Sequence, residues 1–308
     1  MSVLRDRAED YLEARRALGY KLDSQARILR GFVAYADTVG ATRITIELAL
    51  TWATAPADTD PVWWSRRLSV VRCFARHLHA IDPDTEVPPA HQLPRSTARA
   101  VPYPYTPGDI TALMTAAAAL RSALQAATYP ALIGLLSVTG MRVGEAIKLN
   151  RDDVDFDQGT VSIKLGKFGK SRLLPLHPTT LAALHAYAHR RDVLCPSPAT
   201  TALFVSTVGT RLTYNSVRVI FAGLTRQAGL LPRSARCRPR LHDLRHRFAV
   251  QTLLDWYQAD ADVAARLPLL STYLGHVRPG TTYWYFEATP ELLALATNRI
   301  EHTSRAVP

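Results

Sequence analysis

TGMRVGE, residues 139–145, is the first of four basic segments that together decide the fold, and it places Arg142 between two glycines. Glycine on either side lets the backbone approach a ligand closely. Glu145 follows one helical turn later, where its carboxylate can hold the guanidinium. Alone, this pattern is typical of an ordinary Arg–Glu pair at a helix start, so its meaning depends on the rest of the chain.

Three further segments follow in the order GKFGKSR (166–172), HDLR (242–245) and LGH (274–276), with a tyrosine nine residues after the last. Two guanidiniums, an amine and two imidazoles can surround one phosphate, which a phenol can then attack. The set therefore indicates metal-free phosphoryl transfer through a covalent phosphotyrosine. The candidate catalytic residues are Arg142, Lys167, His242, Arg245, His276 and Tyr285.

The second segment is a glycine-rich turn between two predicted strands. Lys167 on such a turn can reach a leaving 5′-oxygen and protonate it, with Lys170 as the alternative. GKS at 169–171 resembles the end of a phosphate-binding loop, but the pattern GxxxxGKS needs glycine where the chain has Lys164. The turn also joins strand to strand and not strand to helix, so we reject a nucleotide site.

The third segment places His242 and Arg245 three residues apart, on one face of a predicted helix. An isolated pair of this kind is common at protein surfaces, but the further basic side chains around it suit a phosphate docked at the helix N-terminus. Neither Asp243 nor Asp262 lies at a spacing that would complete a metal site. We therefore expect neither a metal ion nor a cofactor.

In this order and spacing the four segments resemble those of tyrosine recombinases of the phage integrase family, over nearly the whole chain. The resemblance implies a DNA strand-exchange enzyme, a site-specific recombinase. Lys167 matches the family's lysine by its place in the turn. Tyr285 matches the nucleophile by its offset from His276, with Tyr283 as the alternative. The segment before LGH is longer than in compact members, and residues 256–267 are the expected insertion.

Composition limits the possible classes of protein. With 308 residues, 47% of them apolar and 20% charged, the chain is long enough for two globular domains. A net charge of +11 predicts attraction to polyanions such as nucleic acid. Three widely spaced cysteines, with no histidines at zinc spacing, favour a reducing compartment over a disulfide framework or a zinc site. We therefore expect a cytoplasmic protein.

Residues 122–141 contain no charged side chain and are long enough to be considered as a membrane span. Polar residues and Pro130 interrupt the stretch, so it predicts two buried helices joined near that proline. The N-terminal residues are charged and amphipathic, unlike a signal peptide. We therefore expect no membrane association.

The fold class that these patterns predict is mainly α, with an N-terminal helical bundle and an α-rich C-terminal domain that contains a small antiparallel β-sheet. Helical periodicity runs through residues 3–80. Residues 82–107 then hold seven prolines, which favour an extended connector. The resemblance implies that residues 1–95 are a core-binding, DNA-binding domain and that residues 96–308 are the catalytic domain.

A basic helix is predicted at residues 63–78, with arginines and histidines interleaved among aromatic and apolar residues. It is either a solvated basic face over a packed core or a helix laid on DNA, and the rest of the chain favours DNA. Beyond the catalytic set, the candidate DNA-binding residues are Arg66, Arg67, Arg72, Arg76, Lys170, Arg172, Arg240 and Arg247.

The resemblance also implies the partners, which are double-stranded recombination sites, a homo-oligomer (a dimer on one site and a tetramer in synapsis) and an accessory or partner recombinase. It further implies that a C-terminal helix, predicted at 289–301, can dock in a neighbouring protomer, with packing on its own domain as the alternative. Two other functions fit the pattern. A type IB topoisomerase uses the same chemistry without synapsis, and an architectural protein would bind DNA without needing the phenol.

The sequence lacks any cluster of carboxylates, histidines or cysteines at metal-ligand spacing, which predicts metal-independent chemistry. DNA cleavage and joining should persist in excess EDTA with no nucleotide added, because positive side chains stabilise the developing charge on the phosphate. The measurement is covalent adduct formation on nicked DNA with and without the chelator. A strict magnesium requirement for the chemical step would instead indicate a hydrolytic nuclease.

Overall fold

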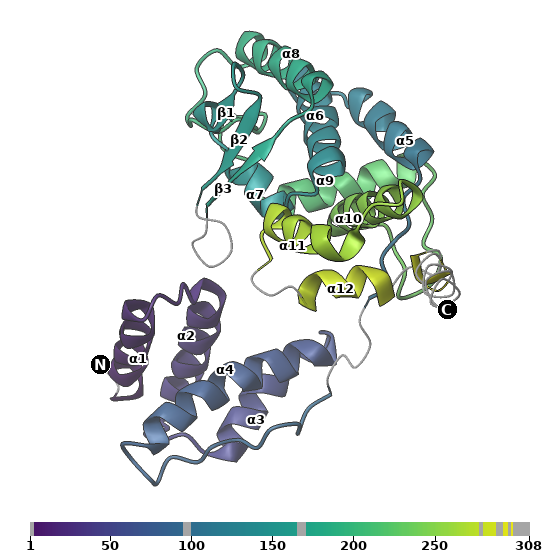
Figure 1. The fold of residues 1–308 in the computed structure, drawn as a ribbon. Helices are drawn as coiled ribbons and strands as arrows, with labels where there is room; N and C mark the ends of the chain where they lie inside the picture. Colours follow the sequence, from purple (N-terminus) through teal and green to yellow (C-terminus); the bar gives the residue numbers. More distant parts are fainter. Residues whose placement is uncertain are drawn as a thin grey trace, which may run out of the picture. The chain divides into compact units, whose positions relative to one another are not determined.

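The computed structural model describes residues 3–94, 100–164, 171–276 and 280–287, together with 292–294 and 297. The chain is mainly helical and contains a three-stranded antiparallel sheet (Figure 1), which confirms the predicted fold class. It divides into two compact units, Met1–Arg99 and Ala100–Pro308, called unit 1 and unit 2 below. The sequence placed the boundary at 95/96, inside the proline-rich connector.

Unit 1 is a bundle of helices around one apolar core. Side-chain caps start two of them: Thr45 Oγ1 accepts from the Leu48 amide at 3.1 Å, and Asp60 Oδ1 accepts from the Val62 amide at 2.9 Å. Phe32 and Phe74 are fully buried in the centre. The helices are α1 (Val3–Ala17), α2 (Asp23–Thr38), α3 (Ile46–Thr54) and α4 (Pro61–His79).

Unit 2 begins with a helix whose start the sequence predicted from Pro107 after Thr106. The two residues belong to a capping box, in which Thr106 Oγ1 accepts from the Asp109 amide and the Asp109 carboxylate accepts from the Thr106 amide. The helices of the unit are α5 (Pro107–Ala118), α6 (Ala123–Thr139), α7 (Val143–Lys148), the short 3-10 helix η1 (Arg151–Asp153), α8 (Pro178–Leu194), α9 (Tyr214–Gln227), α10 (Leu241–Gln258), α11 (Val263–Leu274) and α12 (Gly280–Glu287).

The sheet has the strand order β1 (Val154–Asp155), β2 (Thr160–Ile163) and β3 (Arg172–Pro175), all antiparallel. Val161 pairs with Leu174 in the register, and both are fully buried, so this face of the sheet joins the core. Ile163 pairs with Arg172 at the other end. The glycine-rich turn beyond this pair, with Lys167 and Lys170, lies outside the described residues.

Helix α6 differs from its prediction. The sequence predicted two helices joined near Pro130, whereas one helix runs without a break from residue 123 to 139 with the proline inside it. A proline there removes one hydrogen bond and costs about 3 kcal/mol. Leu132 and Leu136 on the following turns are almost fully buried, and such burial of several leucines outweighs that cost at ~2 kcal/mol each.

Three further predictions concern the helices. In the described part of the chain, none of the helices combines the length and the apolar character that a membrane crossing would require. Of the C-terminal helix predicted at 289–301, residues 292–294 and 297 are described, and all four are helical. The expected insertion at 256–267 covers the end of α10, a turn and the start of α11.

Each end of the connector is attached to the nearer unit. Val87 and Leu93 pack against the core of unit 1. On the other side, the Val101 amide donates to the Arg236 carbonyl at 3.0 Å, and the Tyr105 hydroxyl donates to the carbonyl of Arg240, the residue before α10, at 3.3 Å. The proline-rich stretch is therefore largely part of the two units.

Candidate active site

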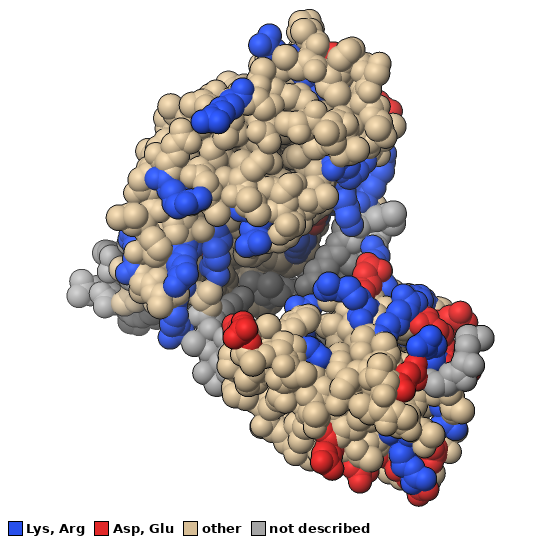
Figure 2. All heavy atoms as spheres, turned by 180° about the vertical axis from the view of Figure 1, so that it is seen from behind, with Lys and Arg blue, Asp and Glu red and all other residues tan. Residues whose placement is uncertain are grey.

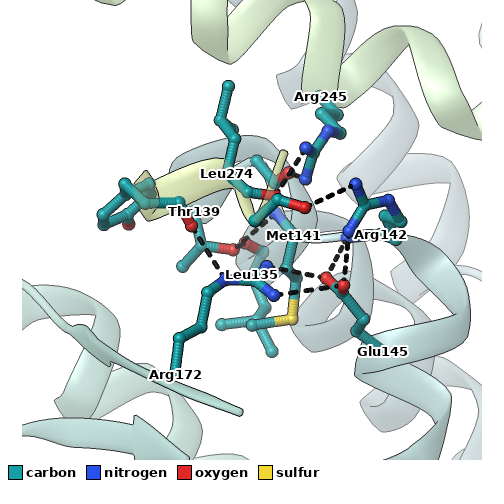
Figure 3. A network of polar contacts seen from close by, with 11 residues as sticks. Leu135, Thr139, Met141, Arg142, Glu145, Arg172, Arg245 and Leu274 are labelled. Atoms are coloured by element: carbon teal, nitrogen blue, oxygen red, sulfur yellow. Dashed lines mark hydrogen bonds and ion pairs between the residues drawn. The ribbon is translucent and has the colours of Figure 1, made fainter. Parts of the chain in front are cut away.

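The C-terminal end of α11 is where the basic residues of unit 2 meet. A helix end leaves its last carbonyls without partners in the helix and carries the negative end of the helix dipole. Here three successive carbonyls each accept a hydrogen bond from a different arginine (Figure 3). The pairs are Arg172 Nε with the Tyr273 carbonyl at 2.8 Å, Arg245 Nη2 with that of Leu274 at 2.6 Å, and Arg142 Nη2 with that of Gly275 at 3.1 Å.

Arg142 lies at the N-cap of α7, and its guanidinium is held as the sequence suggested. Its Nη1 donates to Glu145 Oε1 at 2.7 Å, while Glu145 Oε2 accepts from the Arg142 amide at 2.9 Å. The Glu145 side chain is only 7% exposed. Burial raises the pKa of this carboxyl, but hydrogen bonds from Arg172 and Arg142 outweigh burial and lower the pKa below its usual value. The carboxylate is therefore a stable anionic anchor for two guanidiniums.

Arg245 is the most deeply buried of the three arginines, with 2% of its surface exposed. Besides the Leu274 carbonyl, it donates through Nη1 to the Gly140 carbonyl at 2.9 Å. Gly140 has a φ of +58°, and a Cβ there would collide with the Phe248 ring, so glycine is required. Burial lowers the pKa of Arg245, while the charge and a hydrogen bond of Tyr285 oppose this shift. The guanidinium is thus fixed next to the candidate nucleophile.

His276 and Tyr285 lie next to each other, as the predicted site requires. Their rings are stacked with centroids 6.0 Å apart, and His276 Nδ1 pairs with Thr282 Oγ1 at 2.8 Å. The Tyr285 residue is 4% exposed, whereas Tyr283, the alternative nucleophile, is 56% exposed and turned to solvent.

The two candidate catalytic histidines, His242 and His276, are held in the neutral form. Burial lowers the pKa of His276 to about 4, and the nearby charges of Arg245, Arg142 and Arg172 add to the effect. The pKa of His242 is also lowered, first by burial and then by Arg245. Near pH 7 both imidazoles can therefore accept a proton.

Two residues of the site were not among the candidates. His246 is 7% exposed, and its ring centroid lies 5.2 Å from that of Tyr285 and 5.0 Å from that of Trp284. Its position four residues after His242 places it on the same helical face, a signal that could have identified it. Thr282, the partner of His276, carried no such signal.

Several candidate DNA-binding arginines already contact protein groups. Arg67 donates to the Trp52 carbonyl at 2.6 Å and lies 3.8 Å from the centre of the Trp52 ring. Arg240 forms an ion pair with Asp243, and Arg247 donates to the Tyr105 carbonyl at 3.0 Å. These contacts stabilise the two units, so binding to DNA would require the same side chains to serve two purposes.

The remaining candidates on α4 are freer. Arg66 and Arg76 are exposed, and Arg72 is half-buried with only long contacts, at 3.2 Å to Ser69 Oγ and 3.4 Å to the Pro89 carbonyl. On the face drawn in Figure 2, the Lys and Arg side chains of unit 2 are accompanied by few acidic ones, whereas both signs are mixed on unit 1. Arg66, Arg72 and Arg76 thus remain the candidates on α4 for contacts to phosphate.

A metal site was not expected, and among the described residues none of the His, Cys, Asp and Glu side chains form a group of three that could hold a metal ion.

Comparison with known proteins gives consistent results. Residues 105–291 match the model of the phage integrase family. The chain is 44% identical over 307 residues to the putative integrase/recombinase y4rB of Sinorhizobium fredii, with 98% of each chain covered. Its fold is similar to that of the Tn1549 transposon integrase in complex with transposon right end DNA (TM-score 0.63, 17% identity, 98% of this chain and 100% of that chain). It is also similar to a lambda integrase tetramer bound to a Holliday junction (TM-score 0.60, 18% identity, 92% and 76%).

The low pKa of His276 predicts a specific dependence of stability on pH. The unfolded chain takes up a proton on this histidine near pH 6.5, but the folded chain does so only near pH 4. The free energy of unfolding should therefore fall as the pH drops from 6.5 towards 4, because the unfolded state binds more protons in this range. The free energy of unfolding, measured by urea denaturation at several pH values in this range, should depend less steeply on pH for His276→Gln than for the unchanged protein.

The control is His189→Gln, which replaces an exposed histidine of α8. This substitution should leave the pH dependence of the free energy of unfolding unchanged. NMR titration of the His276 imidazole gives a direct check, and a midpoint near 6.5 would contradict the buried, positively surrounded site.

Proposed function

The chain belongs to the phage integrase family, the tyrosine recombinases, and we propose that it cuts and rejoins DNA at specific sites through a 3′-phosphotyrosyl intermediate. The reaction needs no metal ion and no ATP. One observation supports this most strongly: Arg142 and Arg245 converge on the end of α11, beside His276 and the buried phenol of Tyr285. Binding DNA alone would not need a tyrosine at that place, which disfavours an architectural role.

The arginines stabilise the charge that develops on the scissile phosphate. Each terminal guanidinium nitrogen carries two N–H groups, and the carbonyls at the end of α11 take one from Arg142 and one from Arg245. The second N–H group of each of these nitrogens can donate to a non-bridging phosphate oxygen as the phosphorane forms. Because these donors are already in position, they need no reorganisation when the charge develops. In comparable sites, each such donor lowers the activation free energy by about 3 kcal/mol.

The proton movements complete the step. The Tyr285 oxygen attacks phosphorus and forms the 3′-phosphotyrosyl bond, while the bond from phosphorus to the 5′-oxygen breaks. The neutral imidazole of His276 or His242 takes up the phenol proton. Lys167, outside the described residues, gives a proton to the departing 5′-oxygen. A 5′-hydroxyl from another strand reverses the step, and the number of phosphodiester-type bonds is conserved.

The substrate and the assembly follow from the same proposal. The substrate is a pair of double-stranded recombination sites, with unit 1 as the core-binding domain and unit 2 as the catalytic domain. We propose a dimer on each site and a tetramer in synapsis, with an accessory or partner recombinase, in the cytoplasm. The DNA-bound tetramer of lambda integrase supports the arrangement by similarity of fold. A type IB topoisomerase would use the same chemistry on one duplex, and finding products that join two duplexes would exclude it.

The first test concerns the nucleophile. Tyr285→Phe should bind DNA as tightly as the unchanged protein but form no covalent adduct on a nicked suicide substrate, because only the attacking oxygen is lost. Tyr283→Phe is the matched control, since it removes a hydroxyl two residues away on the same helix and should leave adduct formation intact. An adduct that survives Tyr285→Phe, mapped by mass spectrometry to another residue, would refute the assignment.

The second test concerns the DNA-binding role of α4. Replacing Arg66, Arg72 and Arg76 together by alanine should weaken binding to specific and non-specific DNA alike, because phosphate contacts carry no sequence information. The slope of log affinity against log salt should fall by up to ~3 units. Filter binding or fluorescence anisotropy over a range of salt concentrations measures both effects.

The control is a triple alanine variant of Arg5, Arg30 and Arg43, which also lowers the charge of unit 1 by three. Each of these arginines forms an ion pair on the surface of unit 1. If both triple variants lose the same affinity, net charge and not α4 is responsible. Normal binding by the α4 variant would mean that this helix does not contact DNA.

A further inference from the structure

Arg172 was a candidate DNA contact, and its surroundings indicate another role. On the basis of the proposed function, we infer that Arg172 is a positioning residue for strand cleavage: it holds Glu145 and the end of α11 so that Arg142 and His276 face the phosphate. It does not itself bind DNA.

The first observation is that each of the three nitrogens of the Arg172 guanidinium donates to a protein acceptor. The side chain is 13% exposed. Its Nε donates to the Tyr273 carbonyl at 2.8 Å, Nη1 to Glu145 Oε1 at 3.2 Å and Nη2 to Glu145 Oε2 at 2.9 Å. All three nitrogens thus have protein acceptors, in the two-pronged geometry that arginine forms with a carboxylate (Figure 3). One N–H group remains on each terminal nitrogen, so it is the bidentate ion pair with the buried Glu145 that assigns this side chain to the protein and not to a phosphate.

The second observation is the close fit between Arg172 and Gly275. A Cβ at Gly275 would lie 2.7 Å from Arg172 Nη1 and 2.9 Å from its Cζ, so the guanidinium fills the space of the missing side chain. Gly275 also has a φ of +67°, as expected for a glycine that ends a helix. Since the carbonyl of Gly275 accepts from Arg142 and His276 is the next residue, contact with Arg172 fixes the backbone that orients both.

The third observation is electrostatic. Glu145 is shared by Arg142 and Arg172, so the three side chains together carry one net positive charge. Without Arg172, the buried carboxylate would be balanced by Arg142 alone, and that pair would be neutral. The positive potential offered to a phosphate would then depend on Arg245. Arg172 therefore keeps the charge of Arg142 effective for the reaction.

Arg172 also connects the site to the glycine-rich turn. It is the first residue of β3, and it pairs with Ile163 of β2 at the end of the sheet from which the turn leaves. Lys167, the proposed proton donor, lies five residues earlier in the sequence. The same side chain thus anchors the strand after the lysine to the helix end before His276.

Two substitutions separate the contributions of charge and geometry. Arg172→Lys keeps the charge but cannot hold Glu145 and the Tyr273 carbonyl at once, whereas Arg172→Met loses both. Arg190→Met, which removes an exposed arginine from α8, is the control. Three quantities are measured for each: DNA affinity with its salt slope, the rate of adduct formation at saturating protein, and the pKa of His276 by NMR.

Both Arg172 variants should bind DNA within about twofold of the unchanged protein, yet cleave it about 10- to 100-fold more slowly, as expected from a small misplacement of reacting groups. In the unchanged protein the pKa of His276 is about 4. It should be higher in Arg172→Met and stay close to that value in Arg172→Lys. The groups that act on this imidazole are His242 and Arg245 on α10, Arg142 at α7, Arg172 on β3, and Thr282 and Tyr285 on α12. Glu145 is paired with both Arg142 and Arg172. A residue that only stabilises the fold would not separate the two variants in this way.

Other results would refute the inference. Arg172 is a DNA contact if Arg172→Met weakens binding several-fold and reduces the salt slope by ~1 while saturated cleavage stays normal. Unchanged cleavage and an unchanged pKa of His276 in both variants would also refute it. If Arg172→Met does not fold, Arg172→Lys still tests the cleavage rate at normal affinity. If the unchanged protein forms no adduct, the proposed function fails, and an unchanged pKa of His276 in Arg172→Met would refute the positioning role separately.

Discussion

The candidate active site depends on the hydrogen bonds between arginines and the carbonyl groups at the end of α11. A helix end supplies several acceptors within one turn, and its dipole attracts cations. Arg142, Arg172 and Arg245 come from α7, β3 and α10, and each is bound to its own carbonyl there. Three like charges would otherwise repel one another, and the carbonyls with the buried Glu145 offset this repulsion. His276, the next residue after these carbonyls, is thereby placed among the arginines.

Much of the geometry of the candidate site could be predicted because the necessary information is local in the sequence. Arg142 and Glu145 are three residues apart, as are His242 and Arg245, and side chains at this spacing share one helical face. The start of α5 could likewise be predicted from Thr106 as the N-cap and Pro107 as the first helical residue. The choice of Tyr285 over Tyr283 came from the resemblance to tyrosine recombinases, because the offset of Tyr285 from His276 matches that family, and the assignment stays a prediction.

The rest depends on contacts between distant parts of the chain. Arg172 reaches the Tyr273 carbonyl 101 positions later, and no pattern around either residue indicates the other. In the sequence, Arg172 is one of several basic residues at the glycine-rich turn that contains Lys167 and Lys170. For that reason it was predicted to contact DNA. Pro130 illustrates the same limit, because the local rule predicts a break and packing of the following leucines overrides it.

The attached ends of the connector set a limit on how far the two units can separate. Leu93 packs on the core of unit 1 and the Val101 amide is bound in unit 2, so eight residue-to-residue steps remain between them. Eight steps span at most about 29 Å, whatever their conformation. A tether this short keeps the second unit at a local concentration in the millimolar range once the first has bound. Under the proposed function, in which both units bind DNA, the protein can therefore release and recapture DNA one unit at a time without diffusing away from its site.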